Sequence, residues 1–199
     1  TNKLTVWTPC QSVFGIRNTL SQIFGLPLSQ IRVIKSTMGG SFGCKQETIL
    51  EPLAAAAAIA VQGTVKLVFN REEVISNTML KHPMDVTVQS KFTSTGRCLG
   101  LDVEMVLDAG AYQTVSPSYA RAIREKLGKV YDVDNFHYHG RSVCTNTPVS
   151  GSYRSWSSSE AVYAMESHMN SVADELGIDP VELRLQNIHQ PLGINLPLI

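Results

Sequence analysis

Thr37-Met38-Gly39-Gly40-Ser41-Phe42-Gly43-Cys44-Lys45 is the stretch around which this chain is organised. It follows an apolar run at residues 31–34 and precedes a helix-like segment that begins near Glu47. Three glycines within five residues permit positive φ angles and let a ligand approach bare backbone N–H groups. A strand, a glycine turn and a helix start form a corner that suits anions. On spacing alone, a tight turn with a packed phenylalanine is an equally good interpretation.

The two common nucleotide-binding loops do not fit this stretch. A P-loop reads G-x-x-x-x-G-K-S/T, and counting from Gly39 places Cys44 at the second glycine and Gln46 at the hydroxyl position. The dinucleotide pattern G-x-G-x-x-G is absent from the stretch. The glycine loop therefore needs another ligand or a purely structural role.

Composition describes a globular chain of 199 residues that is 43% apolar and 17% charged. With 17 basic and 17 acidic residues, nothing favours nucleic acid or an anionic membrane as a partner, and no apolar run reaches transmembrane length. The four cysteines form no C-x-x-C pair, which argues against an iron–sulfur or zinc site within the chain. Free thiols and the lack of a signal-peptide pattern predict a cytoplasmic protein, and the N-terminus reads like a cut through a longer polypeptide.

Periodicity predicts an α+β chain of two lobes, residues 1–80 and residues 81–199, each a small mixed or antiparallel sheet packed by helices. A helix is expected after a capping box formed by Thr8 and Gln11. Another is expected to begin at a second capping box, formed by Ser157 and Glu160, and to end at Gly177. The remaining expected elements are strands at 4–7, 31–35, 65–69, 85–92, 98–107 and 136–143, and helices at 47–62, at 71–80 and after Asp179. Residues 114–129 are ambiguous.

Two side-chain patterns predict core positions. Alternation predicts that one face of the strand at 98–107 is buried, and helical spacing predicts a buried stripe on the helix before Gly177. The expected core residues are Leu99, Leu101, Val103, Met105 and Leu107 on the strand, and Val162, Met165, Met169, Val172 and Leu176 on the helix. His137 and His139 have a spacing that could bind a metal, but such pairs are usually ordinary strand residues, and no metal site is assigned.

Ordered blocks along nearly the whole chain resemble the molybdenum-binding region of the xanthine dehydrogenase/aldehyde oxidase family. Each block is short, and their order makes the resemblance specific. The blocks are Gln11, Phe24-Gly25-Leu26-Pro27, Ile31-Arg32-Val33, the loop at 39–45, Glu51-Pro52, Lys81-His82-Pro83, Asp108-Ala109-Gly110-Ala111-Tyr112, Thr145-Asn146-Thr147-Pro148, Tyr153-Arg154, Glu166, residues 176–184 and Asn187.

The resemblance implies a component of a molybdenum hydroxylase, in which a molybdopterin cofactor oxidises an aldehyde or an N-heterocycle with oxygen from water. It implies that 2Fe-2S clusters, and often FAD, lie on other chains or domains and carry the electrons away. The implied partners are the remainder of the molybdopterin subunit, iron–sulfur and flavin subunits or domains, and a small-molecule substrate. Because the family's catalytic glutamate lies beyond residue 199, the chain alone is expected to be inactive and to purify without molybdenum.

The resemblance also implies roles for individual residues. Gln11 occupies the position of a glutamine that hydrogen-bonds an oxygen on molybdenum, and a capping-box role is its structural alternative. Gly39, Gly40, Ser41, Phe42, Gly43 and Arg154 occupy cofactor-binding positions, and Gln46 and Trp156 occupy substrate positions. The structural alternative for Arg154 is a surface salt bridge, and for Trp156 it is core packing. The shared role predicts that Gln11, the 39–43 loop and Arg154 converge on one surface.

Four glycines of the family pattern are replaced here, by Ser41, Cys44, Ser155 and Ser157. Each replacement restricts φ and adds a side chain where a ligand and the backbone should meet. The rival interpretation is therefore a non-catalytic interaction or scaffold module with degenerate cofactor loops. Ser155 stands where the CO dehydrogenase branch has a copper-binding cysteine, so a copper site is not expected. If the chain is part of a larger subunit, apolar side chains that face the missing part should be exposed or covered by a neighbour. The side chains expected there are Phe42, Trp156, Ile194, Leu196, Leu198 and Ile199.

Overall fold

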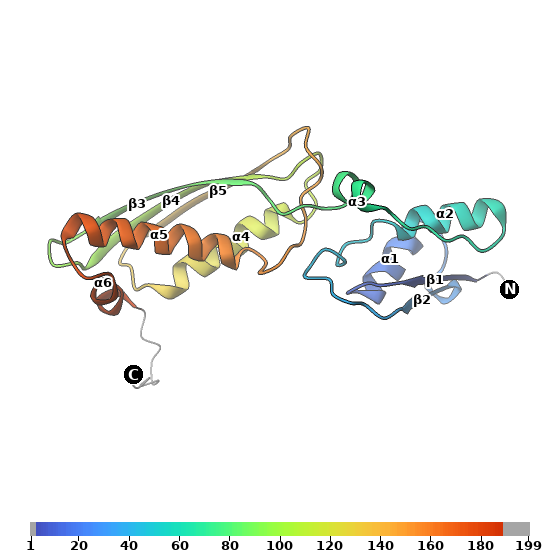
Figure 1. Ribbon diagram of the computed structural model, residues 1–199, viewed down its shortest axis with the longest axis horizontal. Helices are drawn as coiled ribbons and strands as arrows, with labels where there is room; N and C mark the ends of the chain where they lie inside the picture. Colours follow the sequence, from blue (N-terminus) through green and yellow to red (C-terminus); the bar gives the residue numbers. More distant parts are fainter. Residues whose placement is uncertain (1–2, 189–199) are drawn as a thin grey trace. The chain divides into compact units, whose positions relative to one another are not determined.

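The computed structural model describes residues 3–188, which divide into two units (Figure 1). The first unit comprises residues 3–81 and Asn146–Arg154, and the second comprises His82–Thr145 and residues 155–188. We predicted from the sequence that residues 146–154 belong to the second lobe, but the structure assigns them to the first unit. Leu80 N donates to Val149 O at 3.0 Å and Gly151 N donates to Leu80 O at 2.9 Å, so this segment pairs with the end of the first unit.

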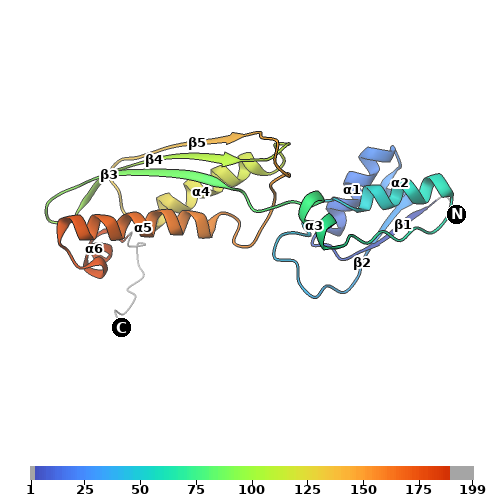
Figure 2. The same cartoon turned by 45° about the horizontal axis from the view of Figure 1, so that its top comes forward.

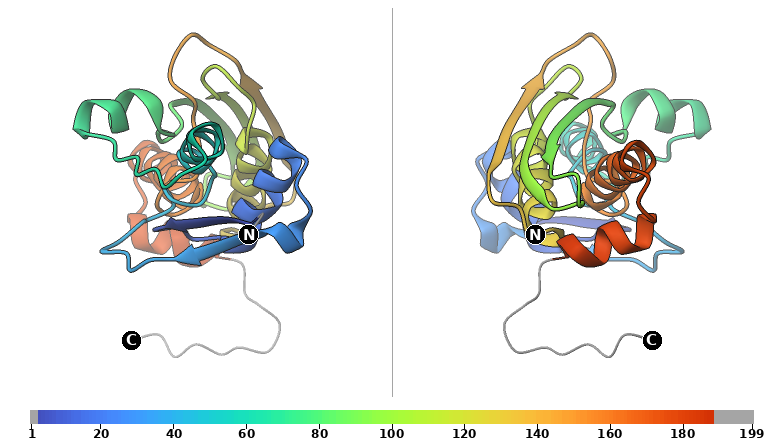
Figure 3. Two further views of the ribbon diagram at one scale, coloured as in Figure 1. Left: turned by 90° about the vertical axis from the view of Figure 1, so that its right-hand side faces the viewer. Right: turned by 90° about the vertical axis from the view of Figure 1, so that its left-hand side faces the viewer.

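The first unit is a strand–helix–strand motif to which two further helices are added. Its elements are β1 (Leu4–Thr8), α1 (Val13–Phe24), the short 3-10 helix η1 (Leu28–Gln30), β2 (Ile31–Lys35), α2 (Glu51–Val61) and α3 (Arg71–Asn77). The strands β1 and β2 pair in parallel, and α1 and α2 lie on the same face of this sheet (Figure 3). The expected mixed or antiparallel sheet is therefore wrong for this unit, because a helical crossover joins strands that run in the same direction.

The start of α1 differs from the expected capping box. The helix begins at Val13, and its N-cap is Ser12, whose Oγ accepts from Gly15 N at 3.2 Å. Thr8 instead ends β1, and its hydroxyl donates to the buried carboxylate of Glu51 at 2.7 Å. The Thr8–Gln11 capping box is thus wrong, because a local cap closer to the helix was available.

Two further expectations for this unit are corrected. Helix α2 begins at Glu51 rather than at residue 47, because residues 45–50 turn and bend first. Residues 64–70 form no strand, although their composition favours one. Leu67 and Val68 are exposed, and a β-prone sequence without a cross-strand partner gains little from extending.

The second unit is a three-stranded sheet with helices on one face (Figure 2). Its elements are β3 (Met84–Phe92), β4 (Cys98–Asp108), α4 (Ser116–Val130), β5 (Phe136–Val143), α5 (Ser158–Leu176) and α6 (Pro180–Asn187). The order is β3-β4-β5, antiparallel between β3 and β4 and parallel between β4 and β5, so this sheet is mixed as expected. The ambiguous residues 114–129 supply α4, the crossover that a parallel β4–β5 pair requires. Together the two units confirm the predicted α+β class.

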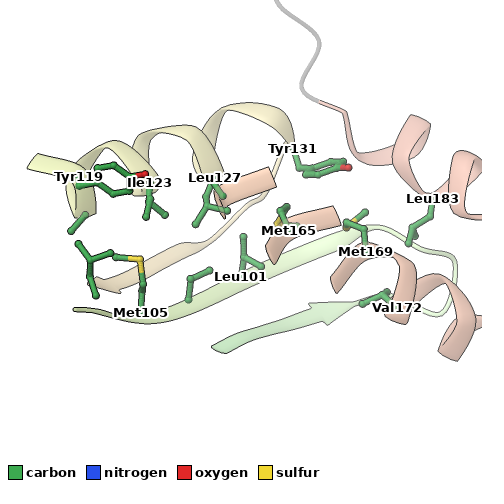
Figure 4. Close-up of a cluster of buried hydrophobic side chains, with 14 of the residues drawn as sticks. Leu101, Met105, Tyr119, Ile123, Leu127, Tyr131, Met165, Met169, Val172 and Leu183 are labelled. Atoms are coloured by element: carbon green, nitrogen blue, oxygen red, sulfur yellow. The ribbon is translucent and has the colours of Figure 1, made fainter. Parts of the chain in front are cut away.

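The core of the second unit lies between the sheet and its helices (Figure 4). Leu101, Val103, Met105 and Leu107 are buried as predicted, but Leu99 is 39% exposed. The register shifts at this point, since Lys91 pairs with Gly100 whereas Phe92 pairs with Cys98. This bulge leaves Leu99 without a partner and gives the buried position to Cys98, so the expectation for Leu99 is wrong.

Helix α5 buries most of its expected stripe. Met165, Met169 and Val172 are buried, but Val162 is 52% exposed. Ser157 precedes the helix with a φ of 70° and makes no side-chain cap, so the second capping box is also wrong. Gly177 ends α5 in the left-handed region, and Asp179 caps α6 through bonds from Val181 N and Glu182 N, both as predicted. The apolar tail residues at 194–199 lie outside the described residues.

Asn187 is a buried polar residue that joins α6 to the β3–β4 hairpin through side-chain hydrogen bonds. We therefore predict that truncating its side chain causes a large loss of stability. Its Oδ1 accepts from Cys98 N at 2.8 Å, and its Nδ2 donates to Gly96 O at 2.7 Å and to Leu183 O at 2.8 Å. Because Asn187→Ala would leave buried backbone groups unpaired, we expect it to lower the free energy of unfolding by about 3 kcal/mol in urea denaturation. Asn135→Ala removes an exposed bond to Leu99 O and should cost about 1 kcal/mol or less. Equal losses for the two variants would contradict this assignment.

Candidate functional site

The glycine loop after β2 is a closed turn with an exposed aromatic ring. Gly43 has a φ of 100° and Phe42 a φ of 52°, and Cys44 N donates to Ser41 O at 3.0 Å. The Phe42 side chain is 66% exposed, so the structural alternative of a packed phenylalanine does not describe this loop. Lys45 Nζ donates to Gly40 O at 2.9 Å, which holds the first half of the loop against the second.

Gln11 lies beside this loop through its backbone. Its N–H donates to Lys45 O at 2.9 Å, which joins the segment between β1 and α1 to the end of the glycine turn. Because Ser12 caps α1, the exposed side chain of Gln11 is not engaged as a capping partner. The structural alternative for Gln11 is thereby removed.

The returning segment brings Arg154 to the same loop. A Cβ at Gly43 would lie 3.0 Å from both N and Cα of Tyr153, so the two backbones touch at this point. The guanidinium carbon of Arg154 lies 5.8 Å from the centre of the Phe42 ring. Arg154 is thus stacked on the loop's aromatic residue, and no carboxylate pairs with it among the described ion pairs.

The expected convergence of Gln11, the 39–43 loop and Arg154 therefore exists within the first unit. Around it lie bare backbone at Gly39, where a Cβ would meet nothing within 4 Å, and a cation above an aromatic face. Such a surface suits a flat heteroaromatic ligand that carries an anionic group. The roles of the individual residues in binding stay predictions.

The two expected substrate residues have different surroundings. Gln46 is exposed at the end of the loop, where its N–H donates to Gly43 O at 3.0 Å. Trp156 belongs to the second unit, and its ring lies 5.3 Å from that of Tyr119, against the core. Core packing thus describes what holds Trp156, and its contact with substrate stays a prediction.

The altered glycines fall into two groups. Ser155, Trp156 and Ser157 form a left-handed run with φ angles of 79°, 44° and 70°, whereas Ser41 and Cys44 have no positive φ. The left-handed serines are held from the side: Ser157 Oγ accepts from Lys126 Nζ at 3.0 Å, and Ser155 Oγ accepts from Ser159 N at 3.2 Å. The loop thus keeps a conformation natural to glycine after the glycines are lost.

Three residues that position the site were not singled out from the sequence. Glu47 Oε1 accepts from both N and Oγ of Ser152, with a donor–acceptor distance of 3.1 Å for the N–H. Lys81 Nζ donates to Arg154 O at 3.3 Å and also lies over the Tyr153 ring. Lys126 Nζ donates to Trp156 O, and partial burial lowers the pKa of its ammonium. Glu47 gave no signal because a glutamate after a glycine turn is typical of a helix start, while the Lys-His-Pro block of the resemblance already contained Lys81.

Outside this site, the second unit has an open cleft of about 390 Å³ between β3 and α5. It is lined by Met84, Val86, Val88, Glu160, Tyr163, Ala164, Ser167, His168 and Ser171. Within residues 3–188, no three His, Cys, Asp or Glu side chains form a group that could hold a metal. His137 Nδ1 lies 2.7 Å from Asp102 Oδ1, as in an ordinary strand pair. Of the helices in the described part of the chain, none has the length and apolar character needed to cross a membrane.

The fold and this surface are typical of a module that binds an extended organic cofactor. A comparison with protein families identifies which one: residues 1–188 match the molybdopterin cofactor-binding domain, and the chain belongs to this family. The resemblance seen in the sequence is thereby confirmed.

Individual relatives agree with this assignment. The chain is 35% identical over 187 residues to a probable xanthine dehydrogenase subunit of Bacillus subtilis, covering 94% of this chain and 25% of that protein. It is 34% identical over 188 residues to the nicotinate dehydrogenase large molybdopterin subunit of Eubacterium barkeri, covering 94% and 44%. The structure of aldehyde oxidoreductase from Desulfovibrio gigas superimposes with a TM-score of 0.91 at 26% identity, covering 97% of this chain and 21% of that one. The chain thus spans less than half the length of these relatives.

Because Ser157 has a left-handed backbone, we predict that glycine is more stabilising than alanine at this position, the reverse of their order inside a helix. Ser157→Ala and Ser157→Gly both lose the bond from Lys126, but only alanine keeps a Cβ at a φ of 70°. We therefore expect the glycine variant to be more stable than the alanine variant by about 1 kcal/mol. Urea denaturation read from Trp156 fluorescence in a Trp7→Phe background measures the difference.

The matched control for Ser157 is Ser167, an exposed residue in the interior of α5. There the order should reverse, with glycine less stable than alanine by about 1 kcal/mol. The same order at both positions would contradict a left-handed conformation at Ser157.

His168 predicts that the second unit loses stability in mild acid. Its Nε2 lies 2.7 Å from Ser90 Oγ, and burial lowers its pKa below the ordinary value of 6.5. A depressed histidine pKa means that the unfolded chain takes up the proton first, so stability is full above about pH 6.5 and falls as the pH drops below it. We expect His168→Gln to reduce the fall between pH 7.5 and pH 5.5. His139→Gln, at an exposed position, is the control and should leave the slope unchanged.

Proposed function

We propose that this chain supplies half of the molybdopterin site of a molybdenum hydroxylase that oxidises an aldehyde or an N-heterocycle with oxygen from water. The observation that carries the proposal is the convergence of Gln11, the 39–43 loop and Arg154, which are far apart in the sequence. Relatives whose names refer to xanthine dehydrogenase, nicotinate dehydrogenase and aldehyde oxidoreductase support the choice of substrate class.

The residues of the loop fit such a cofactor. Gly39 offers bare backbone on an open surface, where a Cβ would meet nothing within 4 Å, whereas a Cβ at Gly40 would lie 2.9 Å from the Phe42 ring. In this proposal Phe42, Gly43 and Ser41 line the pterin, and the Arg154 guanidinium supplies positive charge to its anionic groups. The cofactor, when bound, supplies the two-electron oxidation of carbon.

Two kinds of contact to the reacting end are part of the same proposal. The Gln11 amide would hold the molybdenum end of the cofactor by donating a hydrogen bond to it. Gln46 and Trp156 contact the substrate, the first through its amide and the second through its ring. Gln46 has no charge, so it would hold a polar substrate by hydrogen bonds rather than by general acid–base chemistry.

The proposal extends to the assembly in which the chain acts. The remainder of a molybdopterin subunit would complete the site, and 2Fe-2S clusters and FAD on other chains or domains would accept the electrons. This assembly would act on a small-molecule substrate in the cytoplasm. The length of the relatives supports it, since the Bacillus subtilis protein is matched over 25% of its length.

Loss of the stacked pair should empty the site without unfolding the protein. In the full-length protein that carries this chain, purified from a molybdate-fed host, we expect Arg154→Ala to lower molybdenum and pterin content at least about tenfold. Metal analysis and pterin fluorescence after oxidation provide the two readouts. Arg71→Ala, at the exposed start of α3, is the matched control.

Two results would contradict the proposal. If Arg154→Ala and Arg71→Ala retain the same cofactor content as the parent, Arg154 does not bind the cofactor. If the isolated 199-residue chain holds one molybdenum per chain, the half-site role is wrong.

A further inference from the structure

We propose that Glu47 is a positioning residue that sets the Arg154 guanidinium above the glycine loop. The inference rests on the proposed function, because it assigns Glu47 to the same cofactor site, but its geometry stands without a ligand. Glu47 follows Gln46 at the end of the loop, and it binds a segment about a hundred residues further along the chain. It touches neither Phe42 nor Arg154 in the described contacts, so its effect on them would pass through Ser152.

One carboxylate oxygen carries the connection. Glu47 Oε1 accepts from the backbone N–H of Ser152 at 3.1 Å and from the hydroxyl of the same residue. Two donors from one residue fix both the position and the rotation of Ser152, which is itself 2% exposed. Both bonds need only an oxygen acceptor at this position, and such a bond contributes to stability even when the acceptor is neutral.

The backbone on either side of Ser152 has little freedom to move. A Cβ at Gly151 would overlap the side chain of Met79, and a Cβ at Gly43 would lie 3.0 Å from Tyr153 N. Arg154 follows two residues after Ser152, and Lys81 Nζ holds its carbonyl at 3.3 Å. The place of Ser152 therefore determines where the Arg154 side chain starts, and with it the contact to the Phe42 ring.

The surroundings of the second carboxylate oxygen of Glu47 show that, within the part of the chain that the structure describes, the residue is not held by an ion pair. Oε2 is buried and has no hydrogen-bond partner within residues 3–188, and no cation pairs with Glu47 there. Burying a carboxylate without a counter-charge is costly, so the negative charge does not stabilise this contact. The stabilising feature is the hydrogen-bond acceptor at Oε1. Glutamine keeps this acceptor and removes the charge, whereas alanine removes both. This predicts that Glu47→Gln rescues what Glu47→Ala loses.

The experiment reads the position of Arg154 directly. In the isotope-labelled 199-residue chain, the Arg154 side-chain protons should be shifted upfield by the ring current of Phe42. We expect Glu47→Ala to remove more than half of this shift and to accelerate hydrogen exchange of the Ser152 amide about tenfold, while Glu47→Gln keeps both near the parent values. Phe42→Leu should abolish the shift alone, which verifies its origin.

Each outcome decides the inference. Unchanged Arg154 shifts and Ser152 exchange in Glu47→Ala would overturn it, and so would a Glu47→Gln variant as perturbed as the alanine variant. If Glu47→Ala fails to fold, judged by lost protection in α1 and β2, Ser152→Ala takes its place. That variant keeps the N–H bond and loses the hydroxyl bond, so part of the shift should be lost, and an unchanged shift would overturn the inference.

A second measurement keeps this inference distinct from the proposed function. In the full-length protein, molybdenum content should follow the NMR shift, falling in Glu47→Ala and remaining in Glu47→Gln. Parent protein without molybdenum, together with the expected shifts, would refute the proposed function and leave the positioning role intact. Normal molybdenum content in Glu47→Ala despite a lost shift would overturn the link from Glu47 to the cofactor.

Discussion

The pairing of residues 146–154 with the end of the first unit is the constraint on which the site depends. Two backbone hydrogen bonds at Leu80 return the chain to a unit that it left at residue 82. Without that return, the glycine loop would lack its arginine, since Arg154 comes from a stretch flanked on both sides by the second unit. The close approach at Gly43 then sets the spacing of the two backbones, because a Cβ there would lie 3.0 Å from Tyr153 N and Cα, while Gly151 leaves room for the Met79 side chain.

A glycine in a family pattern can be required for a positive φ or for the close approach of a neighbouring group. The structure distinguishes these two requirements at the altered positions. Ser155 and Ser157 occupy left-handed backbone, so the conformation is kept at some cost in strain and supported by hydrogen bonds from Ser159 and Lys126. Ser41 and Cys44 have no positive φ, so their side chains cost no backbone strain. Gly43 meets both needs, with a φ of 100° and a neighbouring backbone at contact distance. Degenerate loops would be expected to lose this geometry, and its retention favours a cofactor site over a drifted scaffold.

Sequence reasoning identified most helices and strands from local patterns, although both predicted capping boxes were wrong, and it failed where distant segments decide the structure. The strand Phe136–Val143, the cap at Asp179 and the turn at Gly177 follow from short patterns, and the structure contains them. The bulge at Leu99 and the return of residues 146–154 depend on partners far along the chain, which no local pattern encodes. The strand expected at residues 65–69 failed for the same reason, since propensity without a partner strand does not decide.

The candidate site shows the same division. Gln11 and Arg154 were found through the family resemblance, because neither an exposed glutamine nor a surface arginine carries a signal by itself. Glu47 was missed because a glutamate after a glycine turn reads as an ordinary helix start, and its partner Ser152 lies far along the chain. Ordered short blocks thus indicated a candidate surface, but they gave no account of what holds it in place.

Trp156 shows that core packing and a role in binding are compatible. Its ring packs against Tyr119, whose hydroxyl donates to Glu160 at 3.1 Å, and its carbonyl accepts from Lys126. These contacts fix the backbone and one side of the ring before any ligand arrives, while the residue stays only partly buried. An aromatic wall of a binding site works best when it is ordered in advance, because no side-chain entropy is then lost on binding. The packing that makes Trp156 look structural is therefore the same packing that a substrate-flanking residue requires.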